Sequence, residues 1–237
     1  MLRIMSDEDR VILDSDIVWY KRSNVLDNKG LFNFYITTDF ATAGGVKNDY
    51  SFISVWAYNH NGDWLWVDGV CRRQLMDKNI DDLFRLASLY RPQSVGIEVS
   101  GQQGGFLPWV QNEMMNRNIY FPLATNIDSN KPGIRPSTAT SKVQRFNVVV
   151  PWFKAGKMWF PEEKKTSPEL VEMMEELRYV TVGQFKSKHD DAIDTISMLA
   201  SLKTWKPSQE APKDDKGNDI WDDLDSERKD YSDSYVA

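Results

Sequence analysis

Three acidic residues that lie far apart in the chain stand where carboxylates could share a metal ion. Asp39 follows the β-rich run LFNFYITT, Glu98 comes at the end of the short apolar run QSVGI, and Asp191 opens the last helical stretch. In an open α/β sheet a ligand site lies beyond the carboxyl ends of the strands, so adjacent parallel strands would bring Asp39 and Glu98 within a few ångströms of each other. Two buried like charges are costly unless a cation neutralises them, and carboxylate oxygens select hard divalent ions such as Mg²⁺ or Mn²⁺. The acids therefore predict a metal site.

Two divalent ions would suit this site, because ions about 3.5–4 Å apart can activate a water and stabilise the leaving oxygen of a phosphoryl displacement. Such chemistry needs no Ser, Cys or His nucleophile, and the chain offers few of them: Cys71 is the one cysteine, and His60 and His189 are the only histidines. This composition excludes an internal disulfide and leaves a structural zinc site short of ligands. Each acid alone also has a plainer explanation, as a turn cap, an ion-pair partner or a helix N-cap.

The run HDDAID before the last helix contains three aspartates, and the sequence leaves open which of them binds metal. We prefer Asp191, which stands just before the apolar run and one turn ahead of Thr195, whereas Asp190 would more naturally cap the helix. Asp194 is a further candidate, and its alternative is a surface position on the helix. His189 could move a proton or orient a phosphate, although a polar flank outside the helix is the plainer explanation.

The patterns between these acids predict an α/β fold built on a mixed five-stranded sheet flanked by helices. Two β-rich runs flank Asn61 and Gly62, a pair suited to a tight hairpin turn, so three consecutive antiparallel strands come first. Helical patterns then alternate with short β-rich runs, which gives the order βββαβαβ and makes the later strands parallel to the first. We expect strands at 31–40, 50–60, 63–73, 93–99 and 119–124, helices at 79–92, 104–118, 141–156, 167–180 and 189–205, and an auxiliary hairpin at 157–162.

The net charge of −6 is concentrated at the C-terminal end of the sequence. Residues 207–237 hold ten acids and four bases, so the rest of the chain has no net charge and can still carry a basic groove for DNA. We interpret 207–237 as an acidic, disordered tail, 1–31 as an N-terminal lead-in, and 32–206 as the functional domain. No stretch approaches the roughly 20 apolar residues of a membrane span, so we expect a soluble, intracellular protein.

The combination of these runs resembles the nuclease domain of the large terminase subunit of tailed bacteriophages, which has an RNase H-like fold. The resemblance extends over about residues 34–202 and is carried by ITTDFATAGGVKNDYSFISVW, YRPQSVGIEVSGQQGGFL and KHDDAIDTISML. It implies that Asp39, Glu98 and an aspartate of the HDD run hold two Mg²⁺ or Mn²⁺ ions for cleaving double-stranded DNA. In that family this cut generates and ends packaged genomes.

The resemblance adds further candidates around this site. Asp49 resembles an auxiliary acid near the metals, with a turn-forming aspartate as the equal alternative. Some relatives use acids three apart, which would bring in Asp194. Lys142 and Arg145 resemble positions near the DNA strand, although such a pair is also typical of a solvated helix face. We also expect three basic loop residues to contact DNA: Lys131, Arg135 and Lys188.

A complete large terminase also contains an ATPase, whose phosphate-binding loop G-x-x-x-x-G-K-[ST] does not occur in this sequence. We therefore expect an isolated nuclease domain that works with a terminase ATPase, the portal protein and the small terminase subunit in the cytoplasm of an infected bacterium. Its cutting of DNA should show little sequence preference. The alternatives are a resolvase or repair nuclease of the same fold, and a module that binds DNA or protein without catalysis.

Overall fold

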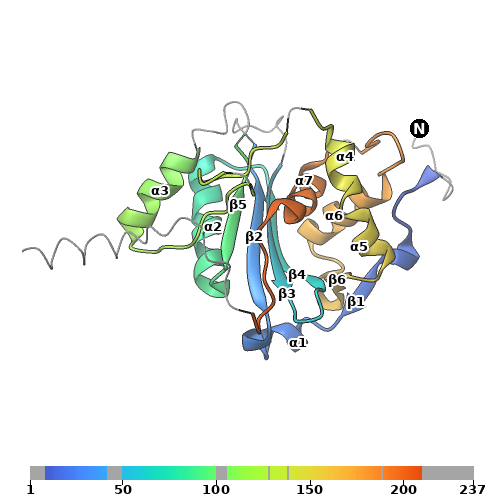
Figure 1. Ribbon diagram of the computed structural model, residues 1–237, viewed down its shortest axis with the longest axis horizontal. Coiled ribbons are helices and arrows are strands. Elements are labelled where there is room, and N and C mark those ends of the chain that lie inside the picture. The colour runs from blue at the N-terminus through green and yellow to red at the C-terminus, as the bar shows by residue number, and fades with distance from the viewer. Residues whose placement is uncertain are drawn as a thin grey trace, which may run out of the picture.

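The computed structural model describes residues 9–41, 50–99, 106–127, 129–137, 139–187 and 189–209, and these residues surround one mixed sheet of six strands (Figure 1). The strands are β1 (Val18–Tyr20), β2 (Asn33–Asp39), β3 (Ser51–Tyr58), β4 (Trp64–Arg72), β5 (Ser94–Ile97) and β6 (Met158–Pro161). They lie side by side in the order β1-β6-β4-β3-β2-β5. A sheet of parallel and antiparallel pairs with helices on both sides confirms the expected α/β fold.

The helices form a layer on each face of the sheet. Figure 1 shows α2 and α3 on one side and α4 to α7 on the other. The helices are α1 (Ser23–Leu26), α2 (Met76–Tyr90), α3 (Phe106–Arg117), α4 (Lys142–Asn147), α5 (Val150–Lys154), α6 (Pro168–Arg178) and α7 (Asp191–Met198). Among the residues that the structure describes, no helix has the length and apolar character needed to cross a bilayer.

Strands β2, β3 and β4 form the antiparallel meander that Asn61 and Gly62 predicted. Gly62 has φ +81°, in the left-handed region where glycine is favoured, and its amide donates to the carbonyl of Asn59 at 3.1 Å. A Cβ at this position would also come within 3.3 Å of the Tyr58 hydroxyl. The turn therefore has both a conformational and a steric reason for its glycine.

Strand β5 pairs with β2 in parallel, as the connecting helix predicted. Thr37 lies opposite Gly96, and Thr38 lies opposite Ile97. The two strands therefore end at the same edge of the sheet, which is the arrangement that the proposed site requires.

The prediction of a strand at 119–124 is wrong. In the described structure this stretch makes a single bridge, between Leu123 and Val95. The reason is Pro122, which has no amide hydrogen to donate to a ladder. The amide of Val95 donates to the Pro122 carbonyl at 2.8 Å, and the amide of Ala124 donates to the Val95 carbonyl at 2.9 Å, so the stretch follows the outer edge of β5 without becoming a strand.

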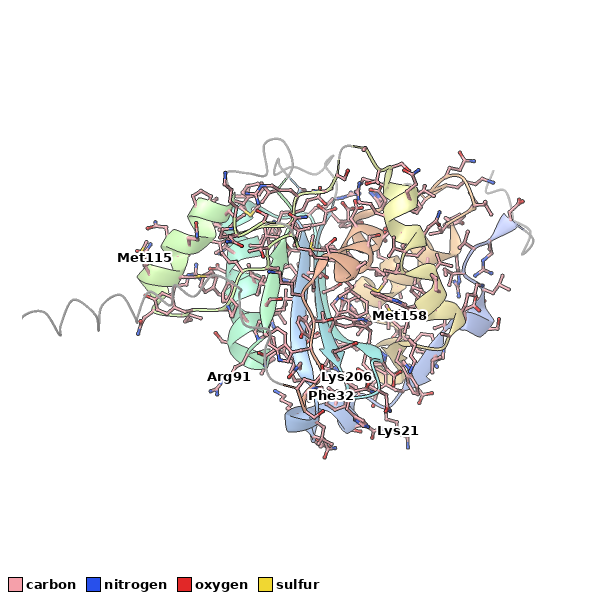
Figure 2. All side chains as sticks on the ribbon, viewed as in Figure 1. Lys21, Phe32, Arg91, Met115, Met158 and Lys206 are labelled. Atoms are coloured by element: carbon pink, nitrogen blue, oxygen red, sulfur yellow. The ribbon has the colours of Figure 1, made fainter. Side chains whose placement is uncertain are left out.

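The prediction of an auxiliary hairpin at 157–162 is also wrong. The residues form one strand, β6, which lies between β1 and β4 and runs parallel to both. The sheet has six strands rather than five, because it gains β6 and also β1, from the stretch that the sequence sets apart as a lead-in, and lacks the strand predicted at 119–124. Met158 and Phe160 of β6 are fully buried, and this burial accounts for the strand. Figure 2 shows Met158 inside the molecule, whereas Met115 lies on the outer side of α3.

The helix predicted at 141–156 is two short helices, α4 and α5. Pro151 lies in the first turn of α5, a position that proline tolerates, and it could not continue a helix from α4. The start of α4 is fixed by a capping box: the Ser141 hydroxyl accepts from the Gln144 amide at 3.3 Å, and the Gln144 side chain accepts from the Ser141 amide at 2.8 Å.

Helix α7 packs directly on the sheet, and every one of its residues is buried. Gly96 permits this close approach, because a Cβ there would lie 2.6 Å from the Met198 sulfur. In the same layer the Ser54 and Thr195 hydroxyls are 3.1 Å apart, and the Trp66 indole donates to the Ser54 hydroxyl at 3.2 Å. These buried hydrogen bonds fix the position of α7 along the sheet.

Candidate active site

Two of the predicted acids stand at neighbouring strand ends. Asp39 is the last residue of β2, and Glu98 directly follows β5. Since Thr38 pairs with Ile97, the next step of the register brings Asp39 opposite Glu98. Side chains alternate along a strand, so both acids lie on the face that carries Thr37 and is covered by α7. Asp39 is 9% exposed, and Glu98 is half-buried.

Helix α7 brings two more acids to the same place. Asp191 is its first residue, and Asp194 follows one turn later. They are only 7% and 5% exposed, so the surface position considered for Asp194 is wrong. We call Asp39, Glu98, Asp191 and Asp194 the acidic cluster.

The acidic cluster shares one electrostatic environment. Burial raises the pKa of Asp39 well above its usual range, and the charges of Asp194, Asp191 and Glu98 raise it further. The Lys142 ammonium acts in the opposite direction. Acids from two strand ends and one helix therefore act on Asp39 at this edge of the sheet.

Two cations of α4 contact the acids of α7. The Lys142 ammonium lies 2.6 Å from Asp194 Oδ2 and 2.9 Å from Asp190 Oδ2, and Arg145 Nη2 lies 3.3 Å from Asp194 Oδ1. The neighbouring carboxylates raise the pKa of Lys142, and burial raises the pKa of Asp194 despite its two partners. Lys142 and Arg145 are therefore not an ordinary solvated helix face.

The helix cap expected from Asp190 is absent among the described contacts. Asp190 occupies the residue before α7, but its side chain makes no hydrogen bond to the first turn and pairs with Lys142 instead. The amide of Ile193 is satisfied by Glu176 of α6, whose Oε2 accepts from it at 2.9 Å. The sequence analysis missed Glu176, although the residue falls on the same helical stripe as the buried Met173 and was thus detectable as a polar residue on an apolar face.

A second cationic group lies on the other flank of the site. The guanidinium of Arg73, which follows β4, stacks 4.3 Å from the Tyr50 ring centroid, and the Tyr50 and His189 rings meet edge to face at 5.0 Å. Arg73 Nη2 and His189 Nε2 are 3.4 Å apart. We call these three residues the Tyr50 group. Because β4 ends at the same edge of the sheet as β2, Arg73 was detectable from the topology alone, yet sequence reasoning missed it.

A groove of about 330 Å³, lined by both polar and apolar side chains, adjoins the acidic cluster. Its lining includes Glu98, Asp194, Arg145 and Arg135, so Arg135 lies beside two of the acids. Arg135 Nη1 donates to the carbonyls of its own loop, including that of Pro132 at 3.0 Å, which fixes the side chain along the groove. Lys131 is exposed on the same loop, outside the described lining of the groove. Asp49 and Lys188 lie outside the described residues.

The acidic cluster fits a divalent cation in donor chemistry and in charge. Its donors are carboxylate oxygens, the ligands that Mg²⁺ and Mn²⁺ prefer, and the raised pKa of Asp39 reflects negative charge that Lys142 does not fully offset. In the described part of the chain, however, no three His, Cys, Asp or Glu side chains already stand in a metal-holding arrangement. The Lys142 ammonium, which is bound to Asp190 and Asp194, supplies positive charge beside the acidic cluster.

Comparison with known proteins gives matches in structure but not in sequence. No protein-family model matches the chain, and no curated protein sequence matches it. The nuclease domain of human cytomegalovirus terminase, soaked with Mn, superposes with a TM-score of 0.57 at 15% identity over 81% of this chain and 95% of that one. The same domain, Mn-soaked and inhibitor-bound, gives a TM-score of 0.57 at 13% identity over 80% and 93%. The large terminase nuclease of the thermophilic phage G20c with bound zinc gives a TM-score of 0.45 at 16% identity over 72% and 81%.

The two matches to the cytomegalovirus domain show the fold. The chain has the RNase H-like α/β fold of a viral terminase nuclease domain, as the sequence resemblance predicted. At 13% and 15% identity the likeness concerns the fold, so the chemistry has to be argued from the residues of the site.

Proposed function

We propose that this protein is a metal-dependent endonuclease that cuts double-stranded DNA with little sequence preference, as the nuclease part of a viral terminase. The observation that carries the proposal is the acidic cluster. Carboxylates from β2, the end of β5 and α7 converge at one edge of a sheet whose fold is that of terminase nuclease domains. Burial and the charges of three other acids raise the pKa of Asp39, and a carboxyl perturbed in this way is a frequent mark of a functional site.

The metal ligands in this proposal are Asp39, Glu98 and Asp191. Two Mg²⁺ or Mn²⁺ ions would supply an activated water and charge stabilisation on the phosphate. Asp194 and Asp190 are both held by Lys142 in the described structure, so they remain further candidates for metal ligands outside the proposed set of three. The ligand carboxylates need to draw together to hold an ion, and repulsion between them opposes this until the ion is present.

The proposed substrate fits the cations on the two sides of the acidic cluster. Arg145 and Arg135 line the groove on one side, and Lys142 lies beside them, so these side chains would contact phosphates of a strand that lies along the groove. The Tyr50 group would hold Arg73 ready for a phosphate on the other side. We retain Lys131 and Lys188 as proposed DNA contacts. Contacts to phosphates carry no base information, which agrees with cutting of low sequence preference.

The biological setting extends the same proposal. A terminase nuclease would work with an ATPase part, a portal protein and a small terminase subunit, in the cytoplasm of a phage-infected bacterium, and it would cut the viral genome during packaging. Asp49 would assist near the metals. Each of these proposals holds only if the protein is a nuclease.

A second candidate is a module of this fold that binds DNA without cutting it. The observation that favours it is Lys142, because an ammonium bound to two acids can serve as a permanent counter-ion in place of a metal. The two candidates make opposite predictions about metals.

Incubation of supercoiled plasmid with the purified protein distinguishes them. The proposal predicts nicked and linear products with Mn²⁺ or Mg²⁺, none with EDTA, and none with the Asp39→Asn variant in a folded state. A protein that binds the plasmid and leaves it intact with every divalent ion would support the second candidate and contradict the first. A strong preference for branched over linear duplex would instead point to a resolvase.

A further inference from the structure

The first turn of α7 carries two acids of the site and is capped by another helix. The first amides of a helix have no partner within the helix and need one from outside. Asp190, in the cap position, gives its carboxylate to Lys142 and makes no described cap bond. The Ile193 amide instead donates to Glu176 Oε2 at 2.9 Å, and the Ala192 amide also lies near this carboxylate.

Glu176 occupies a position whose surroundings would suit an apolar residue better. It is 1% exposed and lies on the inner stripe of α6 with Leu170, Met173 and Leu177, which are exposed by at most 2%. A carboxyl group in such a place loses its hydration and is retained only at a cost to stability. The hydrogen bond that its Oε2 accepts comes from Ile193, at the start of the helix near Asp191. A negative or hydrogen-bonding group at this end also interacts favourably with the helix dipole.

Taking the proposed nuclease as its basis, we propose that Glu176 is a positioning residue of the active site, which holds the first turn of α7 so that Asp191 and Asp194 face Asp39. Ile193 lies between these two aspartates in the turn, so a bond to its amide controls both. Glu176 would contact neither the metal nor the DNA.

Lys142 and Arg145 of α4 also hold Asp194 in the first turn, whereas the attachments of α7 to the sheet lie further along the helix. The hydroxyl pair of Thr195 and Ser54 and the contact of Met198 above Gly96 hold its middle and its end. Loss of the Glu176 bond should therefore leave the helix on the sheet and loosen its first turn. A purely structural cap would change stability alone, whereas a positioning residue changes metal affinity in a folded protein.

The test compares Glu176→Gln, which keeps an acceptor of the same shape, with Glu176→Met, which fills the space without one. Glu175→Met, at an exposed position of the same helix, is the matched control. On the full chain we would measure Mn²⁺ binding by the electron paramagnetic resonance signal of the free ion, plasmid cleavage, and amide hydrogen exchange of the metal-free protein at residues 191–194. Circular dichroism would verify folding. If Glu176→Met does not fold, Glu176→Asp, whose side chain is one methylene shorter, takes its place.

We expect Glu176→Met to weaken Mn²⁺ binding and cleavage by tenfold or more and to accelerate exchange at residues 191–194 by a similar factor. Glu176→Gln and Glu175→Met should remain within about threefold of the parent, where a threefold change corresponds to about 0.65 kcal/mol. Exchange that stays unchanged in Glu176→Met, or a Gln variant as defective as the Met variant, would overturn the positioning role. If the parent protein itself cuts no DNA, the nuclease proposal fails, and the exchange data then report separately whether Glu176 holds the turn.

Discussion

Replacing Asp39 by Asn should stabilise the metal-free protein and remove its response to Mn²⁺. Asp39 is 9% exposed, and burial together with three neighbouring acids raises its pKa well above the usual range. A group with a raised pKa in the folded state contributes stability below its unfolded pKa, and this contribution is lost as the pH rises through the folded value. At pH 8 the folded protein therefore bears the cost of ionising Asp39, which an amide does not incur.

The size of this effect follows from the strand geometry. Directly paired residues of neighbouring strands are about 4.8 Å apart, and two unit charges at that distance repel by about 3 kcal/mol at an effective dielectric constant of about 20. Glu98 follows the end of the neighbouring strand, the charges of Asp194 and Asp191 act on Asp39 more strongly than that of Glu98, and Lys142 offsets part of the repulsion. We expect Asp39→Asn to raise the free energy of unfolding by about 1–3 kcal/mol at pH 8 in EDTA, and by less at pH 5.

The assay is urea unfolding followed by circular dichroism, with Asp68→Asn as the matched control. The Asp68 carboxylate on β4 is bound by Arg22 and Lys164, and these cations and the Tyr90 hydroxyl keep its pKa below the usual range despite burial. Its replacement should destabilise the protein by about 1–3 kcal/mol, the opposite sign from Asp39→Asn. Mn²⁺ should raise the unfolding midpoint of the parent and of Asp68→Asn, but not that of Asp39→Asn. The reasoning is refuted if Asp39→Asn is destabilising in EDTA, or if Mn²⁺ stabilises it as much as the parent.

Three further outcomes follow from the same contacts. Burial raises the pKa of Glu176 from 4.5 to about 8, so the metal-free protein should lose stability as the pH rises from 4.5 to 8. Urea unfolding of Glu176→Gln should show a flatter dependence of stability on pH. The same pH dependence in the parent and in Glu176→Gln would contradict Glu176 as the cause. Arg73→Ala, in a DNA-binding assay without metal, should reduce the slope of log K against log salt by about 1, and an unchanged slope would remove Arg73 from the phosphate contacts. Gly96→Ala should destabilise the protein by about 1–3 kcal/mol, because the added Cβ would lie 2.6 Å from the Met198 sulfur. Gly183→Ala is the control, since no described atom lies within 4 Å of its added Cβ. Equal urea unfolding midpoints for the two variants would argue against close packing of α7 on the sheet.

Local patterns were enough to predict the part of the fold that supports the site. Alternating β-formers and the turn at Gly62 gave the meander, and a helix between two short strands gave the parallel pair β2 and β5. Those two features place Asp39 beside Glu98. The errors occurred where pairing depends on tertiary contacts: Pro122 limits residues 119–124 to one bridge, and β6 pairs with β1 from nearly 140 residues earlier in the chain.

The site itself was only partly predictable for the same reason. Whether Asp190 caps its own helix or binds Lys142 depends on where α4 packs, which local sequence does not determine. The sequence can place Glu176 on the apolar stripe of α6, but its partner, the amide of Ile193, is known only from the tertiary packing. Residue type and spacing identify the acids, whereas their counter-ions and supporting hydrogen bonds arise from tertiary packing.

The central claim is that Asp39, Glu98 and Asp191 jointly hold divalent metal. The most direct measurement is the anomalous difference density of a crystal soaked in Mn²⁺. Our account predicts manganese peaks bounded by these three carboxylates. Manganese bound only elsewhere, or an acidic cluster that holds no manganese at saturating Mn²⁺, would contradict it.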